Sequence, residues 1–67
     1  MREVTITQKN KSPESYVFNK SEFLKFLDDK SIIKAEELAK QVVKEVWKLT
    51  SGEKFSVMNY TFTSEKI

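Results

Sequence analysis

The stretch from Lys34 to Ser51, KAEELAKQVVKEVWKLTS, carries the strongest structural signal in the chain. Its apolar residues occupy one half of a helical wheel, and the charged residues occupy the other half. The apolar residues are Ala35, Leu38, Ala39, Val42, Val43, Val46, Trp47 and Leu49. Glu36 and Glu37 in the first turn and Lys48 near the last suit the helix dipole, and Gly52 follows as a possible left-handed cap. The pattern predicts an amphipathic helix over 34–51.

A second, shorter helix is predicted upstream of this one. Asn19 is a favourable N-cap residue, and Glu22 stands three residues later, where its carboxylate can reach back to the cap. We expect this helix to run to about Asp29 and to be followed by a break near Lys30 and Ser31. Four apolar residues fall within one arc of its wheel, namely Phe23, Leu24, Phe26 and Leu27.

Two strands are predicted ahead of the helices. Arg2–Lys9 alternates apolar and polar residues, which is typical of a half-buried strand. The polar run Asn10–Ser15 holds the only proline and indicates a turn. Tyr16–Phe18 is aromatic and β-branched, as strands tend to be. We therefore expect the two strands to pair in an antiparallel manner.

A last strand is predicted over Glu53–Thr63, a segment rich in aromatic, β-branched and threonine residues. Its apolar pattern changes phase near Met58 and Asn59, which indicates either a bulge or burial of both faces. The final residues, Ser64–Ile67, are expected to fray.

Together these segments indicate a single α+β domain over residues 1–67. The expected architecture is a small three-stranded antiparallel sheet with two helices, in the order β-β-α-α-β. A chain of 67 residues has room for one domain and a modest core. Dimerisation would be one way to add stability to so small a core.

The composition argues against enzymatic and metal chemistry. Histidine and cysteine are both absent, so the commonest general base and the most nucleophilic side chain are missing. A Cys/His zinc site is excluded for the same reason. The single glycine leaves no glycine-rich loop for phosphate. We therefore expect a protein that is not an enzyme and holds no metal or cofactor.

The most informative candidates for binding are the aromatic residues on the predicted strands. They offer more apolar surface than one helix layer obviously needs, and could form a protein-binding or dimerising face or a stacking platform for single-stranded nucleic acid. The alternative is that the first helix covers them. Trp47, at the edge of the apolar half of its helix, is either an interface anchor or part of the core. The candidate partner-binding residues are Tyr16, Phe18, Met58, Tyr60, Phe62 and Trp47.

A row of lysines on the long helix supports a different hypothesis. Lys40, Lys44 and Lys48 recur at intervals of four residues, and such a row can follow a phosphate backbone. However, Glu36 is placed to pair with Lys40, and the formal net charge is only +2. The chain also has a single arginine, the usual reader of guanine. Nucleic acid is therefore the less favoured partner.

The size, the α+β order and the lack of catalytic groups resemble those of small phage- or plasmid-encoded accessory proteins, which often bind and block one host protein. The expected function is a non-enzymatic protein-binding module that regulates or inhibits a larger protein. A nucleic-acid-binding protein and a homodimeric structural protein remain the alternatives. With no apolar run of signal-peptide or bilayer-spanning type, we expect a cytoplasmic protein with no membrane partner.

Overall fold

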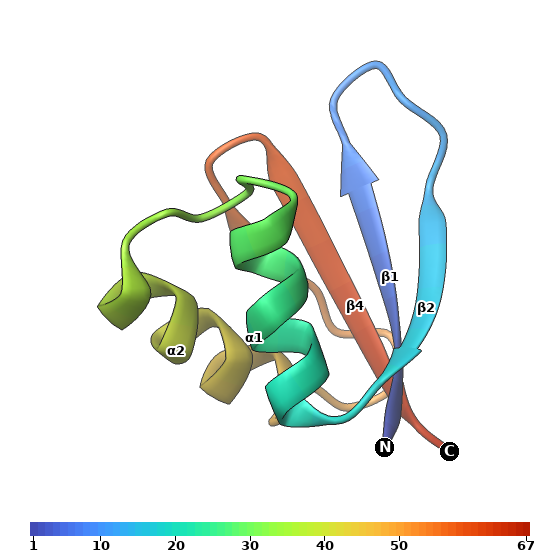
Figure 1. Ribbon diagram of the computed structural model, residues 1–67. Coiled ribbons are helices and arrows are strands. Elements are labelled where there is room, and N and C mark those ends of the chain that lie inside the picture. Colours follow the sequence, from blue (N-terminus) through green and yellow to red (C-terminus); the bar gives the residue numbers. More distant parts are fainter.

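A computed structural model describes all residues, 1–67, and confirms the α+β class and both helices. The strands form one antiparallel sheet in the order β2-β1-β4-β3. Both helices lie on the same face of the sheet, α1 against β2 and α2 against β4 (Figure 1). The elements are β1 (Arg2–Gln8), β2 (Glu14–Phe18), α1 (Lys20–Asp29), α2 (Glu36–Val46), β3 (Phe55–Val57) and β4 (Tyr60–Lys66).

The predicted three-stranded sheet is wrong, because residues 53–63 form parts of two strands and not one. Val57 pairs with Tyr60 and Phe55 pairs with Phe62. The two residues between Val57 and Tyr60, Met58 and Asn59, therefore form the turn of a tight hairpin. Directly paired residues of antiparallel strands lie on the same face of a sheet. All four side chains therefore face the helices, and the turn accounts for the phase change in the sequence without a bulge or a doubly buried strand.

Met58 occupies the first position of this turn with a φ of +55°. A left-handed backbone costs a non-glycine residue about 1–2 kcal/mol, and the exposed Met58 side chain gains little packing in return. Glycine has more conformational entropy in the unfolded chain, which offsets part of this gain. We therefore expect Met58→Gly to raise the free energy of unfolding, measured by urea denaturation, by about 0.5–1 kcal/mol.

The control for this prediction is Gly52→Ala. Gly52 has a φ of +90°, and an added Cβ would meet no atom within 4 Å, so only backbone strain would change. That variant should lose stability while Met58→Gly gains it. If Met58→Gly lowers stability, the methionine backbone is not strained in the native turn.

The first helix begins as the sequence predicts. The Asn19 side chain accepts a hydrogen bond from the Glu22 amide at 2.8 Å, and the Glu22 carboxylate accepts one from the Asn19 amide at 2.9 Å. The second helix is shorter than predicted, since it ends at Val46 with Trp47 as its cap. Residues 48–51 are thus part of the connection to β3.

The predicted fraying at the C-terminus is also wrong, because β4 continues to Lys66. Ser64 is 2% exposed, and its hydroxyl donates to the Val46 carbonyl at 2.9 Å. Arg2 donates to the same hydroxyl at 2.7 Å. These bonds hold the last strand against the end of α2.

The core lies between the sheet and the two helices. Each strand and helix around it contributes apolar side chains from one face, following the periods of two and 3.6 residues. The buried apolar residues are Val4, Ile6, Phe18, Phe23, Leu27, Ile32, Ile33, Ala39, Val42, Val43, Val46 and Phe62. Neither helix has the length or the apolar character needed to cross a membrane.

Candidate functional site

The strand aromatics that the sequence suggested for partner binding all point toward the helices. Phe62 is fully buried, and Phe18 is 9% exposed. The Phe18 ring lies 5.5 Å from Phe23 and 5.1 Å from Phe26, measured between centroids. Phe18 and Phe62 therefore pack in the core, and their binding role stays a prediction that this conformation does not favour.

The other candidates differ in how much of them a partner can reach. Tyr16 and Tyr60 are half-buried at the margin of the core, and Met58 is 68% exposed at the hairpin tip. Trp47 is half-buried, with its ring 5.6 Å from Phe23 in a stacked arrangement. Part of each of these four side chains remains accessible.

The open face of the sheet is polar. Thr5 bonds to Ser15 at 2.9 Å and Ser56 bonds to Thr61 at 3.1 Å, each through the side-chain hydroxyls. Of the large apolar residues, Val17 is exposed there. Single-stranded nucleic acid binds through exposed aromatic rings on which bases stack, and this face offers none.

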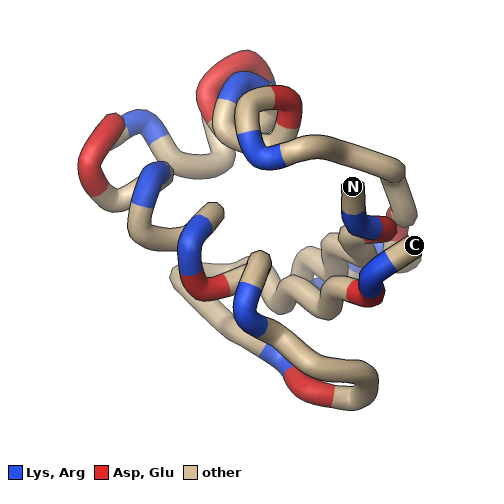
Figure 2. The backbone as a smooth tube through the Cα atoms, turned by 90° about the horizontal axis from the view of Figure 1, so that it is seen from below, with Lys and Arg blue, Asp and Glu red and all other residues tan.

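Lys40 and Lys44 lie on the outer surface of α2 and Lys48 lies just after its end, and all three side chains are exposed. Lys40 pairs with Glu36 at 3.3 Å, the one ion pair in the structure. Figure 2 shows basic and acidic positions interspersed along the chain, with no long run of one sign. The only aromatic side chain beside these lysines is the half-buried Trp47. The role of the lysine row in nucleic-acid binding stays a prediction.

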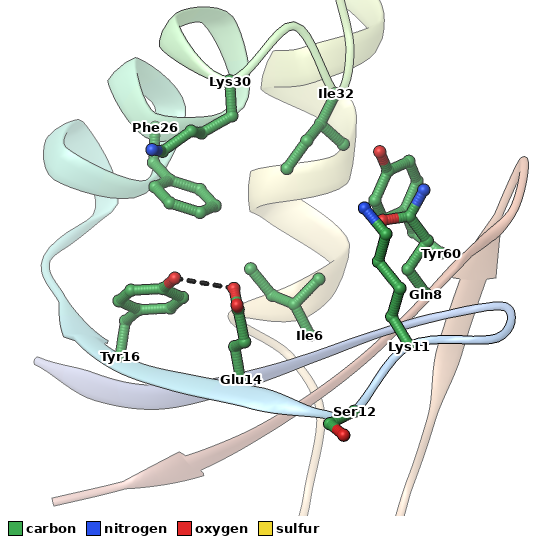
Figure 3. A pocket seen from close by; sticks show the side chains of 10 residues that line it. All are labelled: Ile6, Gln8, Lys11, Ser12, Glu14, Tyr16, Phe26, Lys30, Ile32 and Tyr60. Carbon is green, nitrogen blue, oxygen red and sulfur yellow. Dashed lines mark hydrogen bonds between the residues drawn. The ribbon is translucent and has the colours of Figure 1, made fainter.

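The structure adds a site that the sequence did not reveal, a cleft of about 480 Å³ between the β1–β2 hairpin and the C-terminal end of α1. Tyr16 and Tyr60 stand on opposite sides of it, and Phe26 lies above Tyr16 (Figure 3). The centroids of the Tyr16 and Phe26 rings are 5.0 Å apart. The full lining is Ile6, Gln8, Lys11, Ser12, Glu14, Tyr16, Phe26, Lys30, Ile32 and Tyr60.

Ile32 reaches this cleft because of the way α1 ends. Ser31 adopts a left-handed φ of +54°. Its amide donates to the Asp28 carbonyl and the Ile32 amide donates to the Leu27 carbonyl, both at 3.0 Å. This is the Schellman arrangement, in which the residue after the left-handed position packs against the last turn. It turns the chain back over the core and seats Ile32 beside Leu27.

The other two non-glycine residues with a left-handed backbone lie at the same end of the molecule. Asn10 lies in the β1–β2 loop with a φ of +67°, and Met58 lies in the β3–β4 turn. The Lys9 amide donates to the Asn59 carbonyl at 3.3 Å, which ties these two turns together. Figure 1 shows both turns and the α1–α2 connection at one end, with the two termini at the other. Strained backbone concentrates at functional sites, and here it lies at the end of the molecule that holds the cleft.

The charged side chains around the cleft differ in whether they have a partner within the protein. The Tyr16 hydroxyl donates to the Glu14 carboxylate at 2.8 Å, and this bond raises the pKa of Tyr16 above its ordinary value. Glu14 therefore already has a partner within the protein. Lys11 and Lys30 are exposed and form no ion pair. The cleft therefore combines an apolar floor with two free cations at its rim.

Of the ten lining residues, sequence reasoning had named only Tyr16 and Tyr60 as candidates. The rest come from segments far apart in the chain, and no spacing pattern connects them. Comparisons with known protein families, with curated proteins and with solved structures found no match.

Proposed function

We propose that this protein is a binding module that holds a segment of another protein in the cleft beside β2, and that it regulates or inhibits that protein by doing so. The observation that carries the proposal is the cleft itself. A concave site with an apolar floor and a few polar groups at its rim is the usual form of a binding pocket. Its volume of about 480 Å³ can take one or two side chains of a partner.

Binding fits the cleft better than catalysis does. Catalytic groups have to be held in place by packing and by supporting hydrogen bonds. Lys11, Lys30 and Glu14 are all exposed side chains, and only Glu14 is held by a neighbour, through Tyr16. Such groups suit recognition of charge at a rim.

The edge of the sheet next to the cleft supports a protein partner. β2 is the outer strand of the sheet, and it sends Glu14 and Tyr16 into the cleft. An open edge strand can pair with an extended segment of another chain, while neighbouring pockets select its side chains. The other edge strand, β3, has three residues and offers much less backbone. Edge and cleft together form a site for an extended peptide.

Site-specific photocrosslinking in source cells tests this proposal. A photoreactive phenylalanine analogue would replace Gln8 in the cleft, Thr63 on the open sheet face or Lys44 on the outer face of α2. We expect position 8 to give one protein adduct that mass spectrometry can name, and the two control positions to give none.

Other adducts would contradict the proposal. Nucleic acid crosslinked at position 44 would favour the lysine row. An adduct of twice the protein's own mass would favour the homodimer. A protein adduct at position 63 without one at position 8 would move the interface to the open face of the sheet.

A further inference from the structure

We infer that the segment bound in the cleft is acidic, with an aromatic or branched apolar side chain entering the cleft and a carboxylate two residues away meeting Lys11 on one side or Lys30 on the other. This inference rests on the proposed function and names the chemistry of the partner. Three features of the cleft support it: the charge at its rim, the apolar character of its floor and the geometry of a strand paired with β2.

The charge at the rim favours an anion. Lys30 comes from the end of α1 and its side chain extends toward Phe26, while Lys11 comes from the β1–β2 loop and ends beside Gln8 and Tyr60. The two ammonium groups therefore lie on different sides of the cleft (Figure 3). Neither has a carboxylate partner in the protein. The one carboxylate in the lining, Glu14, accepts the Tyr16 hydroxyl. A bound carboxylate would therefore meet an unpaired cation on either side of the cleft, a complementarity that steers binding and suppresses other partners.

The floor favours an apolar anchor. Ile6 is 7% exposed and Ile32 is 9% exposed, and both lie between the rings of Tyr16 and Tyr60 (Figure 3). Aromatic rings prefer tilted or offset contacts with other rings, and Tyr16 and Phe26 already pack in this way, with an interplanar angle of 48°. A ring or a branched side chain inserted here would displace water from the apolar part of the lining.

The geometry of a strand paired with β2 sets the spacing between the apolar anchor and the carboxylate. In a strand paired with β2, alternate side chains would point to the helix side of the sheet, about 6.5–7 Å apart. Two successive side chains on that side can thus occupy the floor and the rim together. The recognised pattern is an aromatic or branched apolar residue separated by one residue from Asp or Glu.

Selection from a random peptide display library on the intact protein tests the inference. We expect enriched peptides to contain this spacing. A synthetic peptide from the selection would then be titrated against Lys11→Glu/Lys30→Glu and against Lys44→Glu/Lys48→Glu. These variants change the net charge equally, and each removes one cation from the region just after a helix, so circular dichroism should report similar folding. The cleft variant should weaken binding at least about tenfold, and the α2 variant less than about twofold.

A charge-swapped peptide, with Lys in place of its acidic residue, should recover affinity for the cleft variant. Equal loss of affinity in both variants would overturn the inference, since binding would then follow net charge alone. Peptides that depend on Tyr60 but not on Lys11 or Lys30 would overturn it while leaving the proposed function intact. If no enriched peptide loses affinity on Tyr60→Ser, the cleft is not the binding site and both fail.

Discussion

Replacement of Phe62 by alanine is expected to lower the free energy of unfolding by about 3–5 kcal/mol. Phe62 is fully buried in β4, and its ring meets that of Phe23 edge-on with centroids 5.7 Å apart. A domain of this length is expected to have a total stability of only about 3–10 kcal/mol. The variant should therefore lose most or all of its folded population at room temperature.

Urea denaturation followed by Trp47 fluorescence measures this effect, because the only tryptophan stacks on Phe23 and reports on the same part of the core. Phe62→Leu keeps much of the volume and should lose about 1.5 kcal/mol at most. Met58→Ala, at a side chain that is 68% exposed, should change stability by less than about 0.5 kcal/mol. A Phe62→Ala protein as stable as the parent would mean that the ring is not in the core.

The expected unfolding of Phe62→Ala limits which residues can be changed to test the binding site. The sequence suggested Tyr60 and Phe62 as one apolar surface, and replacing both would abolish binding simply by unfolding the protein. Tyr60 is half-buried and lines the cleft, so Tyr60 alone can be changed at a smaller cost in stability. Loss of binding in Tyr60→Ser, with a cooperative unfolding transition retained, is the informative outcome.

The parts of the fold that follow from local sequence were predictable. The cap of α1 depends on Asn19 and Glu22, which lie three residues apart, and the alternation of β1 depends on one short segment. The hairpin of β3 and β4 was missed because Met58 and Asn59 lack the glycine that marks most two-residue turns. Without that signal, the segment reads as one strand with an irregular pattern.

The candidate site was less predictable than the fold, for two physical reasons. Alternation along a strand shows which side chains share a face, but not whether helices cover that face. The aromatics of β2 and β4 could thus be grouped correctly and still not be placed in the core or on the surface. The cleft, in turn, brings together Ile6, Phe26, Ile32 and Tyr60, whose proximity depends on the packing of α1 on the sheet.

The single arginine of the chain is expected to give the second large effect. Arg2 donates through Nη1 to the Leu49 carbonyl and to the Ser64 hydroxyl, both at 2.7 Å, and Ser64 passes a hydrogen bond on to the Val46 carbonyl at 2.9 Å. These contacts join β1, β4 and the end of α2 at the end of the molecule opposite the cleft (Figure 1). Arg2→Met keeps an apolar stem but removes both charge-assisted bonds, and should lower the free energy of unfolding by about 2–3 kcal/mol.

Ser64→Ala should destabilise the protein by about 1–2 kcal/mol, because it leaves the buried Val46 carbonyl without this donor. Since Arg2 and Ser64 act as one network, the double variant Arg2→Met/Ser64→Ala should lose less stability than the sum of the single losses, by about 0.5–1.5 kcal/mol. A double-mutant cycle in urea measures that coupling, and additive losses would show that the two residues act independently. In either case, the affinity of the folded protein for a cleft peptide should stay the same, because neither residue lines the cleft.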